Sequence, residues 1–272
     1  MTSSSLQLKY VNKLAGARVI VFGGTSGIGF AVASAALEHG ASVIVSSSKP
    51  ERVANAVKRL KDAYPDSDYH ARIGGYPCDL SNPEKIEQNL ITVLELATKN
   101  RNTLLDHVAF TAGDRLNLSP IEDISVEYIN NTGNVRFVAP LILAKLSRKY
   151  MKVADSSSIT FTTGAGIFRP NPQWSVLQGY ASGVEGLRRS LSLELAPIRV
   201  NTVCPGAIQT ELFDSFFSSK TELEEVLKGW AKESLLNKVG QPEEIAEAYL
   251  YLMKDTFATG TMVLSDGGKI LK

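Results

Sequence analysis

Cysteine and histidine are scarce in this sequence, which holds two cysteines and three histidines among 272 residues. Cys78 and Cys204 stand in apolar surroundings without metal-ligand spacing, so buried thiols are expected rather than a disulfide or a metal site. His107 falls in an apolar run and is expected to be a strand residue. His39 and His70 are expected on the solvated surface.

Excess charge and long apolar runs are also missing. The formal net charge is +1 and no basic patch occurs, which argues against nucleic acid as a partner. No apolar run is long enough to span a bilayer, so no membrane segment is expected. Residues 1–8 are polar and lack the apolar core of a signal peptide, so a cytoplasmic location is expected.

What the chain does contain is an alternation of apolar strands and helices, without repeats or a dividing linker. This pattern predicts an α/β protein with a single Rossmann-type, doubly wound parallel sheet and helices on both faces. We expect one domain over 1–272, with a cofactor-binding half at 12–115 and a substrate-binding half at 116–272. The segment near 211–238 is expected to form a lid, although its amphipathic pattern suits an oligomer contact equally well.

A glycine-rich turn stands between the first apolar strand and the first helix. The run 19–22 is followed by Gly23, Gly27 and Gly29, and then by the helical segment 31–37. Glycines let the backbone turn tightly and approach a pyrophosphate, which binds the free N–H groups and positive dipole of the helix N-terminus. The turn therefore predicts a dinucleotide site. Its predicted contacts are Gly23, Thr25, Ser26, Gly27 and Ile28.

The segment after the second strand indicates which dinucleotide binds. Enzymes that prefer NAD usually place an acidic residue about twenty residues past the glycine turn, where it holds the ribose 2′-OH. Here the sequence is Ser46-Ser-Ser-Lys49, with Arg52 one turn on. Hydroxyls and cations suit a 2′-phosphate, so NADP(H) is predicted, with Ser47, Ser48 and Lys49 as contacts. The alternative is that Ser48 only caps the following helix.

The spacing Gly-x-x-x-Gly-x-Gly resembles that of the short-chain dehydrogenase/reductase superfamily. The similarity covers essentially the whole chain: Asp79-Leu80 ends the third strand, Thr-Ala-Gly113 replaces the family's Asn-Ala-Gly, and Pro-Gly206 ends the sixth strand. The resemblance implies adenine contacts after the third strand, nicotinamide contacts after the sixth, and a homotetramer. The cofactor contacts that it implies are Asp79, Leu80, Ala112, Gly113, Pro205, Gly206, Ile208 and Thr210.

An ordinary member of this superfamily reduces a carbonyl with Asn, Ser, Tyr and Lys, where Tyr gives the proton and Lys lowers the pKa of Tyr. Tyr180 invites assignment as that acid, but Val184 stands where the Lys belongs. Segment 185–197 matches, without a gap, the helix that follows the Tyr-Lys pair. Counting back from it puts Leu177 at the Tyr position and Ala181 at the Lys position.

The same count, continued without gaps, reaches the other two catalytic positions. Gly164 falls at the Ser position, just after two threonines, and Arg136 falls at the Asn position. Asn134 is the rival at that last position if the register slips. All four usual catalytic groups are then missing.

Two interpretations follow from this loss. One is a pseudoenzyme that keeps the fold as a cofactor sensor or a partner-binding module. The other is a reduction that needs no proton donor. Hydride transfer to a ketone builds charge on oxygen and requires a nearby acid, whereas hydride transfer to an iminium quenches a positive charge that is already present. Loss of Lys also removes a buried cation that would repel such a substrate.

The loop after the fifth strand indicates an aromatic ligand. Phe168 and Trp174 offer stacking surface, and Asn171 is a neutral donor and acceptor. Arg136 is suited to donate to an amide oxygen. For Trp174 the alternative is plain core packing. For Arg136 it is an ion pair with Glu122, Asp123 or Asp114.

The pattern is most similar to one small branch of the superfamily, the fungal bifunctional reductase/Diels–Alderases of bicyclo[2.2.2]diazaoctane indole alkaloids, the malbrancheamide and paraherquamide group. In these, NADPH reduces a cyclic iminium of a prenylated dipeptide, and the same pocket folds the azadiene for an intramolecular [4+2] cycloaddition. The resemblance implies this activity on an aromatic alkaloid intermediate, with Arg136, Asn171 and Trp174 as site residues. The alternative is a generic NADPH-dependent short-chain reductase of secondary metabolism.

One site residue departs from this branch. The branch has an acidic residue three positions before the Trp, and this chain has Asn171 there. Asn matches Asp in shape but carries no charge. Binding and geometry are therefore expected to be kept, while part of the electrostatic stabilisation of the cation is lost.

Overall fold

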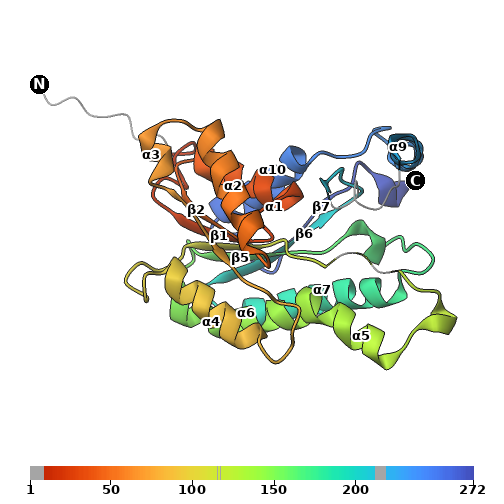
Figure 1. The fold of residues 1–272 in the computed structure, drawn as a ribbon, viewed down its shortest axis with the longest axis horizontal. Coiled ribbons are helices and arrows are strands. Elements are labelled where there is room, and N and C mark those ends of the chain that lie inside the picture. The colour runs from red at the N-terminus through yellow and green to blue at the C-terminus, as the bar shows by residue number, and fades with distance from the viewer. Residues whose placement is uncertain (1–8, 115, 117, 212–218) are drawn as a thin grey trace, which may run out of the picture.

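The computed structural model describes residues 9–114, 116, 118–211 and 219–272. These form one seven-stranded sheet with parallel neighbours, in the order β3-β2-β1-β4-β5-β6-β7 (Figure 1). The strands are β1 (Arg18–Phe22), β2 (Ser42–Ser47), β3 (Ile73–Pro77), β4 (His107–Phe110), β5 (Ser158–Thr162), β6 (Arg199–Pro205) and β7 (Met262–Ser265). The predicted Rossmann-type parallel sheet is confirmed.

Helices cover both faces of the sheet, as Figure 1 shows. One face carries α1 (Gly27–Glu38), α2 (Pro50–Ala63) and α10 (Pro242–Lys254), and the other carries α4 (Ile86–Ala97), α6 (Ala139–Tyr150) and α7 (Ser175–Glu194). The remaining segments are α3 (Ser67–His70), η1 (Ile121–Asp123), α5 (Val126–Gly133), η2 (Asn134–Val138), η3 (Ala165–Ile167), α9 (Lys220–Glu233) and η4 (Lys269–Leu271).

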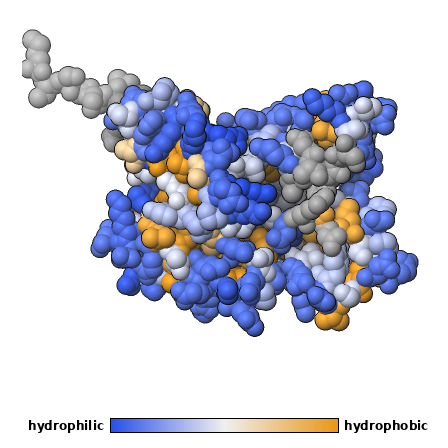
Figure 2. Space-filling model, in the orientation of Figure 1, coloured by the Kyte–Doolittle hydropathy of each residue, from blue (hydrophilic) through white to orange (hydrophobic). Residues whose placement is uncertain are grey.

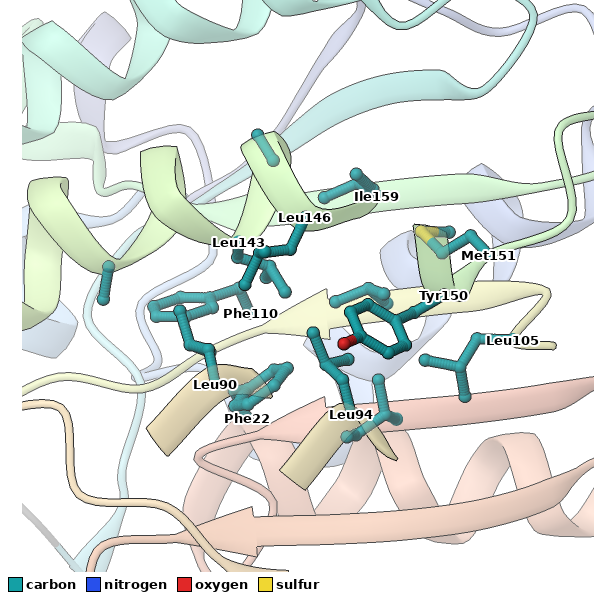
Figure 3. Packing of buried hydrophobic residues seen from close by; sticks show 14 of the residues in the cluster. Phe22, Leu90, Leu94, Leu105, Phe110, Leu143, Leu146, Tyr150, Met151 and Ile159 are labelled. Carbon is teal, nitrogen blue, oxygen red and sulfur yellow. The ribbon is translucent and has the colours of Figure 1, made fainter. Parts of the chain in front are cut away.

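The core between the sheet and α4 and α6 holds the ends of the central strands in place. Figure 3 shows Leu90 and Leu94 of α4 and Leu143 of α6 around the rings of Phe22 and Phe110. The two rings end β1 and β4 and stack with their centroids 5.6 Å apart. Burying one such side chain contributes roughly 1.5–3 kcal/mol, so this packing fixes the strand ends from which the site is built.

On the opposite face, α1 presents small residues to the sheet. Gly29, Ala33 and Ala36 are buried on α1, and α10 lies beside it. Small side chains let the helix axis approach the strand. The first residues of α1 therefore lie directly over the end of β1.

The strand order reverses at the centre of the sheet. β1 pairs with β2 on one side and with β4 on the other. Helix α1 follows β1 on one face, whereas α5 and α6 follow β4 on the opposite face (Figure 1). Such a reversal leaves a crevice outside the carboxyl ends of the strands, which is where ligands bind in open α/β sheets.

The scarce residues lie largely as expected. Cys78 and Cys204 are buried, free thiols, and His107 is buried in β4, so these predictions are confirmed. The surface prediction for the other two histidines is wrong, because both rings are half-buried. His39 bonds the carbonyl of Ala35 and His70 that of Lys61, and each ring therefore covers a carbonyl near a helix end.

The outer surface is mainly hydrophilic on the face of Figure 2, where hydrophobic residues emerge only in separate patches. Among the described residues, no helix is long and apolar enough to cross a membrane. Of the predicted lid near 211–238, residues 212–218 lie outside the described residues, and α9 occupies most of the rest. Its role as a lid stays a prediction.

Candidate active site

The site begins at the turn between β1 and α1, where the glycines at positions 23 and 29 leave no room for a side chain. Gly23 has φ +81°, and a Cβ there would lie 2.6 Å from the backbone nitrogen of Ala112. A Cβ on Gly29 would overlap the carbonyl oxygen of Gly23 and the hydroxyl of Thr111. The glycines therefore let the ends of β1 and β4 and the start of α1 meet in one place.

The N-terminus of α1 has no capping anion from its own helix. Its N-cap, Ser26, makes no side-chain capping bond, and the first turn contains no acidic residue. The N–H of Gly27 instead donates to the Glu211 carboxylate at 2.8 Å. Because this N-terminus already accepts a carboxylate, the turn fits the pyrophosphate of a dinucleotide, which uses the same N–H groups and helix dipole.

The predicted ribose contacts lie next to this turn at the end of β2. The N–H of Gly23 donates to the carbonyl of Ser46 at 2.8 Å, which ties the strand end to the turn. Ser47 is half-buried, and Ser48 and Lys49 are exposed. The N-cap of α2 is Lys49, with no side-chain capping bond. The alternative that Ser48 caps α2 is therefore not observed, and these groups face solvent where a 2′-phosphate is expected.

The other predicted cofactor residues lie at the same edge. Leu80 is buried. Asp79 is exposed, and its Oδ1 accepts from the N–H and the hydroxyl of Ser81 at 3.0 and 2.8 Å. On the far side of the turn, the Thr210 side chain lies against Gly27. Ala112 and Gly113 follow β4, whereas Pro205 ends β6 and Gly206 and Ile208 follow it. Their contact with a cofactor stays a prediction.

A cavity of about 140 Å³ lies beside this edge, and its lining includes all four positions that counting assigned to the missing tetrad: Arg136, Gly164, Leu177 and Ala181. They come from η2, the loop after β5, and α7. Among the described lining residues, Arg136 is the only ionisable one. The four positions assigned by counting therefore converge on one cavity, whose described lining contains no Tyr, Lys, Asp or Glu.

A second hollow, of about 380 Å³, shares Arg136 and Leu177 with the first. Asp114, Glu127 and Tyr128 also line it. Two residues with carboxylate side chains thus line a hollow that adjoins the cavity. Burial raises the pKa of Asp114, while the nearby Arg136 guanidinium opposes that rise.

Arg136 is placed by an irregular stretch of helix. It lies in η2, a π-helical segment between α5 and α6, and such segments are frequent at functional sites. Its guanidinium lies over Gly113, 2.9 Å from where a Cβ would be, and Nη2 donates to the carbonyl of Asp114. Burial lowers the pKa of Arg136, and Asp114 opposes that shift.

The two alternatives raised for this position are resolved by contacts. Among the described ion pairs, none involves Arg136, so the alternative of an ion pair with a carboxylate is not observed, and Arg136 bonds the backbone of Asp114 instead. Asn134 is buried, and its amide donates to the carbonyl of Ser81 at 3.0 Å. Asn134 therefore holds the segment after β3, and Arg136 reaches the cavity.

Tyr180 lies outside the cavity. Its hydroxyl donates to the carbonyl of Ile129 at 3.0 Å, and its ring packs against Phe137 with centroids 5.7 Å apart. Its ring also fills the space beside Gly133. Tyr180 therefore joins α7 to α5 and η2, whereas Leu177 and Ala181 line the cavity.

The loop after β5 brings only one of its predicted side chains to the cavity. Trp174 lines it, whereas Asn171 and Phe168 are exposed and absent from the described lining. Gln173 has φ +69°, a left-handed conformation uncommon outside glycine. This reversal directs the chain into α7, with Trp174 as the N-cap. The predicted role of Asn171 gains no support from this geometry.

Two site residues were missed from the sequence. Gln178 lines the cavity, and its amide oxygen is buried without a hydrogen-bond partner among the described residues. It stands four residues after Trp174, on the same helix face, and this spacing was the available signal. Glu211 directly follows the predicted contact Thr210, but nothing local indicates that it reaches Gly27.

Comparison with known proteins agrees with this geometry. A family model described as an SDR-like Rossmann domain matches residues 10–272. The short-chain dehydrogenase/reductase malC of Malbranchea aurantiaca is 39% identical over 259 residues, covering 95% of this chain and 96% of that protein. The short-chain dehydrogenase/reductase fsr5 of Gibberella fujikuroi is 39% identical over 264 residues, with 97% and 98% covered.

A solved structure is similar along nearly the full length. It is the MalC reductase/Diels–Alderase from Malbranchea aurantiaca, with a TM-score of 0.89 and 40% identity. The alignment covers 96% of this chain and 98% of that one.

Proposed function

This chain belongs to the short-chain dehydrogenase/reductase family, and we propose that it reduces a cyclic iminium with NADPH and then templates an intramolecular [4+2] cycloaddition of the product. The substrate class is a prenylated indole alkaloid intermediate. The observation that carries the proposal is the cavity lining: the four tetrad positions converge there, and Arg136 is its only ionisable group among the described residues.

The absence of a general acid from the described cavity lining favours reduction of an iminium over reduction of a ketone. The bound cofactor supplies a hydride. A ketone that accepts hydride becomes an alkoxide and needs a proton near that oxygen, and a general acid typically contributes 10²–10⁴-fold in rate. An iminium becomes a neutral amine and needs no proton in that step. The lining formed by Gly164, Leu177 and Ala181 offers none.

The charges around the cavity suit a cationic substrate. Asp114 and Glu127 line the second hollow, which shares Arg136 and Leu177 with the cavity. Arg136 alone would repel a cation, but the Asp114 backbone carbonyl already accepts from its guanidinium, and the Asp114 carboxylate is electrostatically coupled to it. We assign Arg136 the role of donating to a carbonyl oxygen of the substrate, away from the positive nitrogen.

We assign orientation of the substrate to two residues, the N-cap of α7, Trp174, and Gln178 within α7. Trp174 offers an aromatic face for an indole ring. Gln178 offers a buried amide oxygen without a partner among the described residues, and leaving such an acceptor unpaired costs about 1–3 kcal/mol. An N–H of the substrate, from an indole or a lactam, would satisfy it. Asn171 is proposed only as a peripheral contact.

The cycloaddition half is supported by the relative that carries it in its name, the MalC reductase/Diels–Alderase, and by the shape of the lining. A pocket that holds the diene and the prenyl group in one near-attack conformer accelerates the reaction and selects one isomer. Trp174 and Leu177 are the walls available for this. The NADP preference is supported by Ser47, Ser48 and Lys49, which stand free of capping bonds at the end of β2.

The experiment is to supply NADPH and a prenylated-indole cyclic iminium, follow cofactor oxidation, and resolve the products by chiral chromatography. We expect oxidation and one dominant isomer, and Trp174→Ala should alter the isomer ratio more than the oxidation rate. No oxidation, with cofactor binding intact, supports the pseudoenzyme. An isomer ratio equal to that of chemically reduced iminium removes the cycloaddition and leaves a reductase.

A further inference from the structure

An acidic side chain from the second half of the chain occupies the N-terminus of α1. Oε2 of Glu211 accepts a hydrogen bond from the N–H of Gly27 at 2.8 Å, across 184 residues of sequence. The helix supplies no anion of its own there, because Ser26 makes no capping bond and the first turn is free of acidic residues. Glu211 is thus the described anion that caps α1.

The backbone leading to Glu211 is anchored. Ile208 is buried and forms a bridge with Gly240, whose carbonyl also accepts from the N–H of Gln209 at 2.9 Å. Thr210 then lies against the turn, with its Cγ2 2.9 Å from where a Cβ on Gly27 would be. The position of Glu211 over the turn follows from these contacts.

The N–H that Glu211 binds is the group that a dinucleotide needs. In this turn the pyrophosphate is expected on the first N–H groups of α1. A carboxylate and a phosphate cannot share one N–H at full strength, and two anions at that distance repel each other. Binding therefore has to displace Glu211 or proceed against its charge.

We propose that the Glu211 carboxylate competes with the cofactor pyrophosphate for the N-terminus of α1. It caps the helix when no cofactor is bound, and it weakens cofactor binding. The proposal rests on the proposed function only in that a dinucleotide binds at this turn. It does not depend on the choice between NADP and NAD or on the substrate, because the pyrophosphate is common to both cofactors.

Competition predicts two effects of opposite sign. Removing the charge should destabilise the cofactor-free protein, since α1 loses its capping anion. The same change should strengthen cofactor binding by about 2- to 30-fold, the range that corresponds to a charge at a helix terminus. A residue that merely supports the fold of the site would weaken binding when replaced, so the sign separates the two roles.

The test uses the full chain as wild type, Glu211→Gln and Glu225→Gln. The last removes the same charge from an exposed position on α9 and serves as the control. Calorimetric titrations use NADPH, NADH, ADP-ribose, which carries the pyrophosphate without nicotinamide, and adenosine 2′-monophosphate, which lacks the pyrophosphate. Thermal unfolding is measured without ligand.

For Glu211→Gln we expect the dissociation constants of NADPH, NADH and ADP-ribose to fall by a common factor, with adenosine 2′-monophosphate unchanged and a lower Tm without ligand. Glu225→Gln should match wild type throughout. Weaker or unchanged binding of ADP-ribose by Glu211→Gln overturns the proposal, as does an equal gain for adenosine 2′-monophosphate. If only the predicted NADPH preference is wrong, wild type will bind NADPH and NADH with equal dissociation constants. Glu211→Gln would still lower both constants by the same factor.

Discussion

The hydroxyl of Tyr180 donates to the backbone carbonyl of Ile129, and this bond, 3.0 Å long, ties α7 to α5 instead of facing the cavity. The tyrosine that most resembles a family acid is therefore engaged in packing. Leu177, which the count assigns to the position of the family's tyrosine, lies one helical turn earlier and lines the cavity.

Tyr180→Phe should leave the hydride-transfer rate within about threefold of wild type, because no proton comes from this residue. It should lower the free energy of unfolding by roughly 0.5–1.5 kcal/mol through loss of one hydrogen bond. Stopped-flow measurement of NADPH oxidation and urea denaturation check the two parts. Tyr128→Phe, at a residue that lines the second hollow, should also keep the rate. A loss of 10²–10⁴ in either variant would identify a general acid.

Gln178→Leu separates binding from stability. The variant keeps the bulk of the side chain and removes a buried acceptor that has no partner among the described residues. Stability should stay equal or rise by up to about 1 kcal/mol, while affinity for an N–H substrate should fall by roughly five- to tenfold. Substrates methylated at the indole nitrogen or at the lactam nitrogen identify which N–H donates to Gln178. Once the donating N–H is methylated, the variant and wild type should bind the substrate with equal affinity. Equal losses for the N–H and both N-methyl substrates would remove the hydrogen bond from the account.

Lys49→Ala should narrow the preference for NADPH over NADH by weakening NADPH, with NADH nearly unchanged. A charged contact to the 2′-phosphate is worth about 1.5–3 kcal/mol, roughly ten- to a hundredfold in affinity. Lys58→Ala is the matched control. It removes an exposed cation from α2, the helix whose N-cap is Lys49, and that cation forms an ion pair with Asp62. Calorimetric titration with both cofactors measures the ratio, and equal wild-type affinities would rule out this contact.

The buried His107 predicts that the folded protein loses stability as the pH falls. Burial lowers the pKa of His107 to about 4, from an ordinary value of 6.5. The unfolded chain therefore binds a proton between these values and the folded chain does not, so stability is present above pH 6.5 and is lost as the pH falls toward 4. From pH 7 to pH 5 the loss from this group is about 2 kcal/mol.

His107→Gln should remove that part of the pH dependence, because Gln does not titrate and can still bond the Ser158 hydroxyl, which lies 2.9 Å from the His107 ring. Urea denaturation at pH 7 and pH 5 gives the difference for variant and wild type. His70→Gln, at a half-buried position, is the control and should retain the wild-type difference. If His107→Gln loses as much free energy of unfolding between pH 7 and pH 5 as wild type does, other groups cause the loss of stability in acid.

Much of this architecture could be predicted because it depends on local pattern. The glycine turn and the apolar strands predict a parallel sheet, and an unbroken match of 185–197 to a family helix fixes the register of α7. That register alone predicted that Arg136 and Leu177 occupy catalytic positions, and both line the cavity.

The remainder depends on geometry that no local pattern contains. The left-handed backbone of Gln173 decides that Trp174 turns to the cavity while Asn171 stays exposed. The contact of Glu211 with Gly27 joins segments 184 residues apart. Such contacts depend on the complete fold, and a sequence taken one segment at a time does not predict them.

The most direct test of the central claim compares one pair of substrates in a single turnover. One is an N-alkylated cyclic iminium, whose nitrogen carries no proton to lose, and the other is the ketone of the same ring system. We predict rapid hydride transfer from NADPH to the iminium, at a rate that does not change between about pH 6 and pH 9, and no transfer to the ketone. Reduction of the ketone, with a rate that falls about tenfold per pH unit above the pKa of a protein group, would contradict the account, because it would reveal a proton donor in the active site.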